Sequence, residues 1–150
     1  MKISSSSSVL KILFILIILL SNFISADVRY VSKTGNTQFP YISWETASDS
    51  IQKCLNICDN GDTVYVGNGI YKETLIINKN ISLIGCSMDS TIIDASQLTP
   101  TGVIEFHANG SIVNFTILAH GGSSDAAGIY TMNYDISIKN CKIENAWKGV

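Results

Sequence analysis

Glu105 and His107 form the pair whose residue types and spacing best suit acid–base chemistry. They stand two residues apart in a β-branched segment, so both side chains point to the same side of a strand. One group is then able to donate a proton while the other accepts one. A solvated outer face explains two polar residues at these positions more simply, and we favour that interpretation. No catalytic residue is therefore assigned from the sequence.

Two other polar groups suggest metal binding. His120 precedes a glycine- and serine-rich segment that ends at Asp125, but no further ligand is spaced to complete a site. Residues 59–62 (DNGD) resemble part of a calcium loop, yet the twelve-residue spacing and terminal glutamate of an EF-hand are missing. We interpret the first as a flexible loop and the second as a turn, and we expect no metal and no cofactor.

The first 26 residues have the features of a secretory signal peptide. Lys2 provides a positive start, and residues 9–20 form an apolar stretch that is short for a bilayer span. Small residues end the segment at Ala26. An uncleaved membrane anchor is the alternative, because residues 23–24 extend the apolar run. We expect cleavage after Ala26, a secreted chain that begins at Asp27, and membrane contact only through this segment.

Secretion would place the four cysteines in an oxidising compartment, where disulfides form. Cys54 and Cys58 lie one helical turn apart, so either could face Cys86 on a later segment. We predict one bridge, between Cys58 and Cys86. Cys141 is interpreted as a small buried core residue.

The secondary structure that must position these residues changes character at residue 62. Residues 44–58 place apolar residues on one face of an amphipathic helix, for which Ser43 is a plausible N-cap. A short strand is expected earlier, over residues 28–32. After residue 62 the chain becomes a series of short strand-like runs separated by Asn, Gly, Asp and Ser. These runs begin at Thr63, Thr74, Ile81, Ser90, Gly102, Ser111, Ala127 and Ile136.

Two of these stretches repeat one another. Residues 102–118 align without gaps on residues 128–144, which pairs Gly102 with Gly128, Val103 with Ile129, and Asn114 with Asn140. Stacked aliphatic residues would fill a narrow core, and stacked asparagines would form a hydrogen-bonded ladder. This predicts a parallel solenoid with a ladder at Asn114 and Asn140. An antiparallel sandwich, the alternative, requires no asparagine at a fixed offset.

Three N-x-[ST] sequons are candidate glycosylation sites, at Asn80, Asn109 and Asn114. Asn109 is preferred because Asn-Gly indicates an exposed turn. Asn114 has conflicting assignments, since a ladder residue inside a turn and a glycan in solvent are incompatible. We favour the ladder.

Residues 50–94 resemble the N-terminal region of pectin lyase-like right-handed parallel β-helix proteins, through "SIQKCLN", "GDTVYVGNGIYKE" and "ISLIGCSMDSTIID". That group includes pectin methylesterases, polysaccharide lyases, glycoside hydrolases and surface proteins. The resemblance implies an all-β, right-handed parallel β-helix (solenoid) with an N-terminal capping α-helix. The chain then divides into a signal peptide (1–26), an N-terminal strand with the capping helix (27–62), and the first coils (63–150), which we expect to be incomplete at the C-terminal end.

Composition narrows the function without deciding it. A net charge of -2 and only 15% charged residues argue against nucleic acid as a partner. The abundance of Asn, Ser and Ile favours a secreted or cell-surface protein with a non-catalytic role in carbohydrate binding, adhesion or structure. The alternative is the N-terminal part of a polysaccharide-active enzyme of the pectin esterase, lyase or glycoside hydrolase type, with its active site beyond residue 150. Expected partners are polysaccharide and, through an exposed strand edge, another chain.

Overall fold

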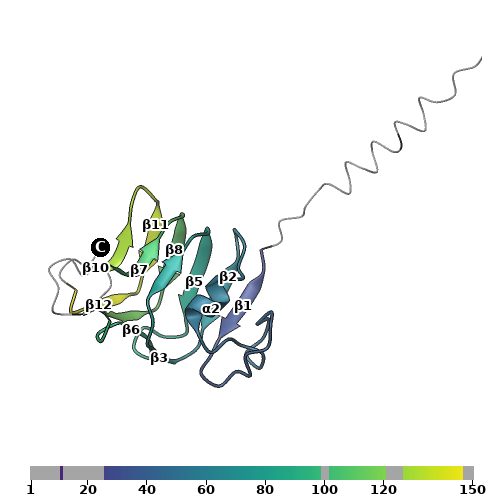
Figure 1. The fold of residues 1–150 in the computed structure, drawn as a ribbon, viewed down its shortest axis with the longest axis horizontal. Helices are drawn as coiled ribbons and strands as arrows, with labels where there is room; N and C mark the ends of the chain where they lie inside the picture. Colours follow the sequence, from purple (N-terminus) through teal and green to yellow (C-terminus); the bar gives the residue numbers. More distant parts are fainter. Residues whose placement is uncertain (1–10, 12–25, 99–101, 121–126, 147–150) are drawn as a thin grey trace, which may run out of the picture.

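Short parallel strands wind into successive coils in the computed structural model, which describes residues 11, 26–98, 102–120 and 127–146 (Figure 1). The expected signal peptide therefore lies outside the described residues, apart from Lys11 and Ala26, as do Asp125 and the last four residues. The described elements are β1 (Val28–Val31), α2 (Ile51–Leu55), β2 (Thr63–Val66), β3 (Gly69–Tyr71), β4 (Leu75–Ile77), β5 (Ile81–Gly85), β6 (Thr91–Asp94), β7 (Gly102–Phe106), β8 (Gly110–Val113), β9 (Thr116–Leu118), β10 (Ala127–Thr131), β11 (Ile136–Lys139) and β12 (Lys142–Glu144).

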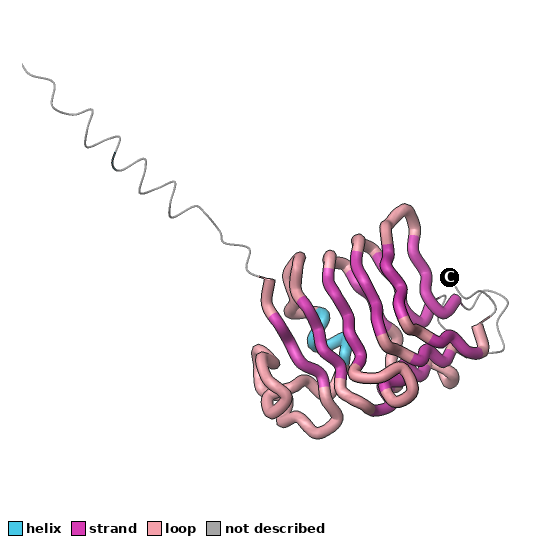
Figure 2. Tube along the Cα trace, turned by 180° about the vertical axis from the view of Figure 1, so that it is seen from behind, coloured by secondary structure: helices cyan, strands magenta, loops and turns pink. Residues whose placement is uncertain are grey.

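Three successive coils, β2–β3–β4, β5–β6–β7 and β8–β9–β10, each contribute one strand to each of three sheets, while β1 precedes them and β11 and β12 follow. The first sheet has the order β1-β2-β5-β8-β11, the second β3-β6-β9-β12, and the third β4-β7-β10. Every strand pairing within these sheets is parallel, so the chain advances along one axis as it winds (Figure 2). The predicted all-β parallel β-helix is confirmed, and the antiparallel sandwich is excluded.

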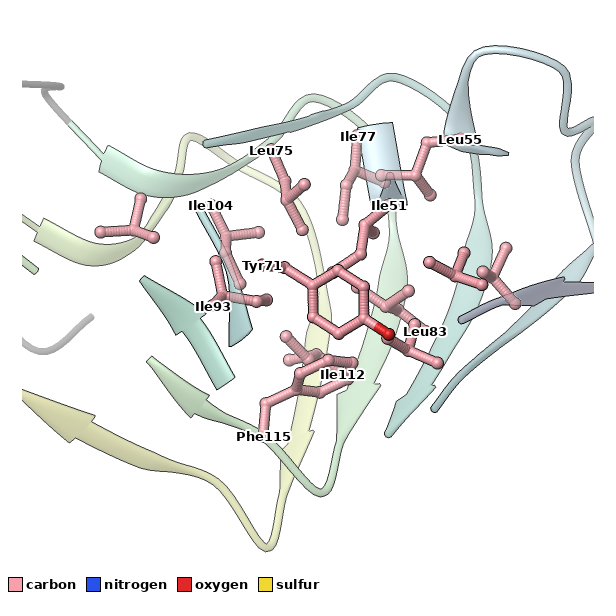
Figure 3. Packing of buried hydrophobic residues seen from close by; sticks show 14 of the residues in the cluster. Ile51, Leu55, Tyr71, Leu75, Ile77, Leu83, Ile93, Ile104, Ile112 and Phe115 are labelled. Atoms are coloured by element: carbon pink, nitrogen blue, oxygen red, sulfur yellow. The ribbon is translucent and has the colours of Figure 1, made fainter. Parts of the chain in front are cut away.

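Aliphatic residues stack in register inside the coils and form the core (Figure 3). One column in the first sheet runs Val64, Leu83, Ile112, Ile138. A second column begins at Tyr71 and continues through Ile93, Ile117 and Ile143. The Tyr71 hydroxyl donates to the carbonyl of Gly67 at 2.9 Å, which satisfies the one polar atom of this buried ring. Burial raises the pKa of Tyr71 to about 12.

The strand pairing predicted from the internal repeat is correct in the first two sheets and wrong by one residue in the third. Ser111 pairs with Ser137 as the gapless alignment predicts. Ile129, however, pairs with Ile104 instead of Val103. The turn after β10 is one residue longer than the turn after β7, so a gapless alignment cannot hold on both sides of it. A slip of one residue in strand pairing would turn each side chain of a strand to the opposite face. The observed register is the one in which Ile129 is buried.

The capping helix is much shorter than residues 44–58. Helix α2 covers only Ile51–Leu55, and its N-cap is Ser50 instead of Ser43. The chain before it pairs with β1: the backbone N–H of Ser48 donates to Tyr30, and the carbonyl of Ser48 accepts from Ser32. The expected apolar face is nevertheless buried, because the turn before the helix directs its side chains inward as well.

Glu73 holds this short helix in place. Its carboxylate accepts hydrogen bonds from the Ser50 hydroxyl (2.8 Å), the Ile51 N–H (2.9 Å) and the Gln52 N–H (3.0 Å). The Gln52 amide group also pairs with both backbone groups of Ile76, the middle residue of edge strand β4. Helix α2 therefore covers part of a sheet edge that would otherwise expose unpaired backbone groups.

The predicted disulfide between Cys58 and Cys86 is not formed, and both are free thiols. Cys58 precedes the start of β2, whereas the backbone N–H of Cys86 donates to Val66 at the end of β2. The two cysteines therefore lie at opposite ends of the paired strands β2 and β5. Within the described part of the chain, no helix is both long and apolar enough to cross a bilayer.

Candidate functional site

The outer face of the first sheet carries an exposed group of aromatic rings. Tyr30 on β1 and Tyr65 on β2 are register partners and point outward, because Arg29, Val31, Val64 and Val66 on either side of them point inward. Trp44, from the turn that follows β1, packs beside them. We call Trp44, Tyr30 and Tyr65 the aromatic face.

The three rings contact one another in sequence. Tyr30 and Trp44 meet edge to face, with ring centroids 4.8 Å apart and an interplanar angle of 62°. Tyr30 and Tyr65 are stacked at 5.9 Å and 24°. Trp44 and Tyr65 remain 44% and 36% exposed. The Cα of Gly67 lies under the indole ring, where a Cβ would be in ordinary contact with it at 3.4 Å, so Trp44 lies over the end of β2.

A column of hydroxyl groups runs beside the aromatic face. Thr63, Ser82, Ser111 and Ser137 occupy equivalent outward positions on β2, β5, β8 and β11. None of the four is buried. Since neighbouring strands lie about 4.8 Å apart, the column presents donors and acceptors at that interval along the axis. The neighbouring outward column continues from Tyr65 through Ile84 and Val113 to Lys139.

This face has the chemistry of a binding surface. The outward positions of its five described strands hold neither a carboxylate nor an imidazole. Exposed aromatic rings bind apolar surfaces of a ligand, and hydroxyl groups bind its polar atoms. The arrangement suits a long ligand that presents both.

Glu105 and His107 do come together, but on a different sheet. His107 Nε2 lies 3.4 Å from Glu105 Oε2, on the outside of β7 in the third sheet. The register neighbours of Glu105 are Ile76 and Tyr130, so neither neighbour in the described strands is a carboxylate or an imidazole that could orient the pair. This geometry supports the interpretation as a solvated outer face.

The two candidate metal segments have structural roles. His120 Nδ1 lies 2.8 Å from the carbonyl oxygen of Ser96, a contact in which the ring nitrogen is the donor. Asp62 is 1% exposed and accepts hydrogen bonds from Asp27, Arg29 and Asp59. Residues 59–62 are thus a turn that places a carboxylate inward. Among the residues that the structure describes, no three His, Cys, Asp or Glu side chains gather to hold a metal ion.

The two ladder asparagines are hydrogen-bonded across coils. Asn140 Nδ2 donates to Asn114 Oδ1 at 2.7 Å, and Asn114 Nδ2 donates to the carbonyl of Gly85 at 3.1 Å. Both asparagines have a positive φ, 65° at Asn114 and 49° at Asn140, a conformation that asparagine tolerates better than most residues. These left-handed residues divide two of the predicted strand runs, giving β8 and β9 in one coil and β11 and β12 in the next.

The three sequons differ in the use of their side chains. Asn80 and Asn109 are exposed, and Asn109 Oδ1 accepts a hydrogen bond from the Asp135 N–H. Asn114 uses the nitrogen to which a glycan would be attached. Glycosylation at Asn109 or Asn80 remains a prediction, and a glycan on Asn114 would be attached to the nitrogen that donates to Gly85.

Replacement of Asn140 by glycine is expected to lower the free energy of unfolding by about 1 kcal/mol, because it removes the ladder hydrogen bond while glycine accepts the positive φ. Asn133→Gly is the matched control: Asn133 is exposed and has a φ of 61°. Urea denaturation measures both variants. Equal stability of the two would show that the ladder bond contributes nothing.

The sequence did not point to the aromatic face. Tyr30 and Trp44 are close in sequence, but Tyr65 joins them only because β1 and β2 pair in parallel across a loop of more than thirty residues. The signal available in the sequence was alternation. Tyr30 lies between Arg29 and Val31, and Tyr65 lies between Val64 and Val66; these four neighbours point inward.

Comparison with known proteins identifies the fold. No protein-family model matches the sequence, and no curated protein matches it by sequence. Among solved structures, the chain is similar to the pectin methylesterase PemA from Erwinia chrysanthemi, with a TM-score of 0.60 and 17% sequence identity. The match covers 78% of this chain and 43% of PemA, so the chain spans less than half of that protein's length. The protein therefore shares the parallel β-helix fold of that structure.

Proposed function

We propose that this chain is a secreted, non-catalytic β-helix protein that binds polysaccharide along the outer face of its first sheet. The observation that carries the proposal is the aromatic face of Trp44, Tyr30 and Tyr65 beside a column of four hydroxyl-bearing residues. The proposed secretion rests on the signal-peptide features of residues 1–26.

A sugar chain matches this surface in chemistry. Each sugar ring has an apolar face of C–H groups, which packs against an aromatic ring, and a rim of hydroxyl groups, which bonds to serine and threonine. The hydroxyl column repeats with the strand spacing, so successive residues of a polymer would meet equivalent groups. The lack of carboxylates and imidazoles on the described part of this face supports binding without turnover.

The similarity to PemA supports pectin as the polysaccharide to test first. The binding face carries no acidic side chain at its outward strand positions, and Lys139 lies at its far end. Neither feature would repel a polymer that contains carboxylate groups.

Tyr65→Ala is expected to raise the dissociation constant for pectin about tenfold, because it removes a stacking surface worth about 1 kcal/mol or more. Tyr134→Ala is the matched control: this tyrosine is similarly exposed, at 40%, in the turn before β11. Affinity electrophoresis in gels with and without pectin measures both. An unchanged mobility shift for Tyr65→Ala, or equal losses in the two variants, would contradict binding at the aromatic face.

The second candidate is the N-terminal part of a polysaccharide-active enzyme. The observation that favours it is the match to 43% of a pectin methylesterase. An assay for methanol release from methyl-esterified pectin tests for activity within this chain, whereas an active site beyond residue 150 would release methanol only from a longer chain. We expect no release from this chain, and release that depends on Glu105 or His107 would favour the enzyme.

A further inference from the structure

We propose that Asp62 is a receptor for the α-ammonium group that leader cleavage creates at Asp27, so that processing stabilises the first coil of the β-helix. The backbone nitrogen of Asp27 already lies 2.8 Å from Asp62 Oδ1. The inference uses the expected cleavage after Ala26 and is independent of any ligand.

The charges around Asp27 do not balance while Ala26 remains attached. The carboxylates of Asp27 and Asp62 share a single guanidinium: Arg29 Nη2 lies 3.2 Å from Asp27 Oδ2, and Arg29 Nε lies 3.2 Å from Asp62 Oδ2. The side chains of Arg29 and Asp62 are only 8% and 1% exposed, whereas that of Asp27 is 55% exposed, so water solvates Asp27 but reaches little of the charge on Asp62. The neighbouring Asp59 has its own cation, Lys79, at 3.5 Å.

Cleavage would supply the missing positive charge at the required position. Water adds across the Ala26–Asp27 peptide bond in a reaction carried out by an endopeptidase. The Ala26 carbonyl becomes a carboxylate, and the Asp27 nitrogen leaves as an amine that takes up a proton. A neutral amide donor to Asp62 thereby becomes a charged donor at the same place, and charge-assisted hydrogen bonds are about twice as strong as neutral ones.

The surrounding backbone fixes that place. The carbonyl of Asp27 accepts from the Thr63 N–H at 2.9 Å, and the next four residues pair with β2. Asp62 is held from the other side by the Asp59 N–H at 2.9 Å. The new terminus therefore cannot move away from Asp62 without breaking the first rungs of the sheet, and this makes the site specific for an α-amino group at residue 27.

The test begins with the protein secreted by a host that processes the leader. N-terminal sequencing is expected to show a chain that starts at Asp27, and a start at any other residue would overturn the proposal. The unfolding equilibrium constant in urea is then compared among three forms: the processed chain, the same chain with its α-amino group acetylated, and a chain that retains Ala26.

The form with Ala26 is the control for charge. It also has an α-ammonium group, but that group lies one residue earlier in the chain, a displacement of about 3.8 Å along the backbone. We expect the acetylated chain and the Ala26 chain each to unfold with an equilibrium constant about tenfold larger than that of the processed chain. In Asp62→Asn, which keeps an acceptor oxygen but no charge, the three forms are expected to differ by less than about threefold. Equal stability of the three wild-type forms, or equal differences with and without Asp62, would overturn the proposal.

Discussion

Replacement of Arg29 by alanine is expected to lower the free energy of unfolding by about 3 to 5 kcal/mol, enough to unfold much of a small domain. Arg29 stands in register with Val64, at the end of the aliphatic column of the first sheet. Its side chain points inward at the β1 end of the core, where it pairs with Asp62 and donates to the carbonyl of Pro40 at 3.1 Å. Without Arg29, a carboxylate that is 1% exposed would lose its guanidinium partner.

The matched control is Lys53→Ala. Lys53 also pairs with an aspartate, Asp49, but both side chains are about half exposed, and solvent-exposed pairs of this kind contribute little to stability. Chemical denaturation followed by circular dichroism compares the two variants. If both lost the same stability, the buried position of Arg29 would have no special importance.

Glu73→Ala is expected to cost about 3 kcal/mol and to release helix α2 from the first coil. The five-residue helix is too short to persist by itself, and the Glu73 carboxylate accepts hydrogen bonds from two of its backbone N–H groups and from its N-cap Ser50. Loss of the helix would also remove the Gln52 contacts that cover the edge of β4. We therefore expect increased self-association as well as lower stability.

Two further variants serve as comparisons for Glu73→Ala. Glu73→Gln keeps one acceptor oxygen and is expected to lose about half as much stability, whereas Glu45→Ala removes an exposed carboxylate from the preceding turn and should be neutral. Hydrogen exchange of the Cys54 and Asn56 amides, which donate to the carbonyls of Ser50 and Gln52, reports the helix directly. Unchanged protection of these amides in Glu73→Ala would show that the helix docks through its apolar side chains alone.

The sequence was sufficient for the fold because a solenoid repeats its environments. Each coil must place an aliphatic residue at the same inward position, so β-branched runs and a recurring asparagine appear in the sequence itself. The strands at Thr63, Ile81, Gly102 and Ala127 begin where the runs predict. Strand β3 was not predicted, because a three-residue strand beside two glycines has no periodicity to detect.

The predictions from the sequence are wrong where a residue is bound by a segment distant in the sequence. Residues 44–48 have the spacing of a helix, but Ser48 finds backbone partners on β1, which satisfies its peptide groups without a helix. Cys58 and Cys86 lie in adjacent coils, yet at opposite ends of paired strands, a distinction that depends on strand register. Register between β7 and β10 likewise depended on one extra residue in a turn.

The sequence alone determined the coil architecture, the position of the cap and the pairing of Asn114 with Asn140, since each depends on local periodicity or on a repeat. Only the tertiary structure decided the aromatic face and the charge cluster of Asp27, Arg29 and Asp62. Both join β1 to residues more than thirty positions later. Parallel strand pairing brings such residues together through backbone hydrogen bonds, which are the same for every sequence and leave no pattern in it.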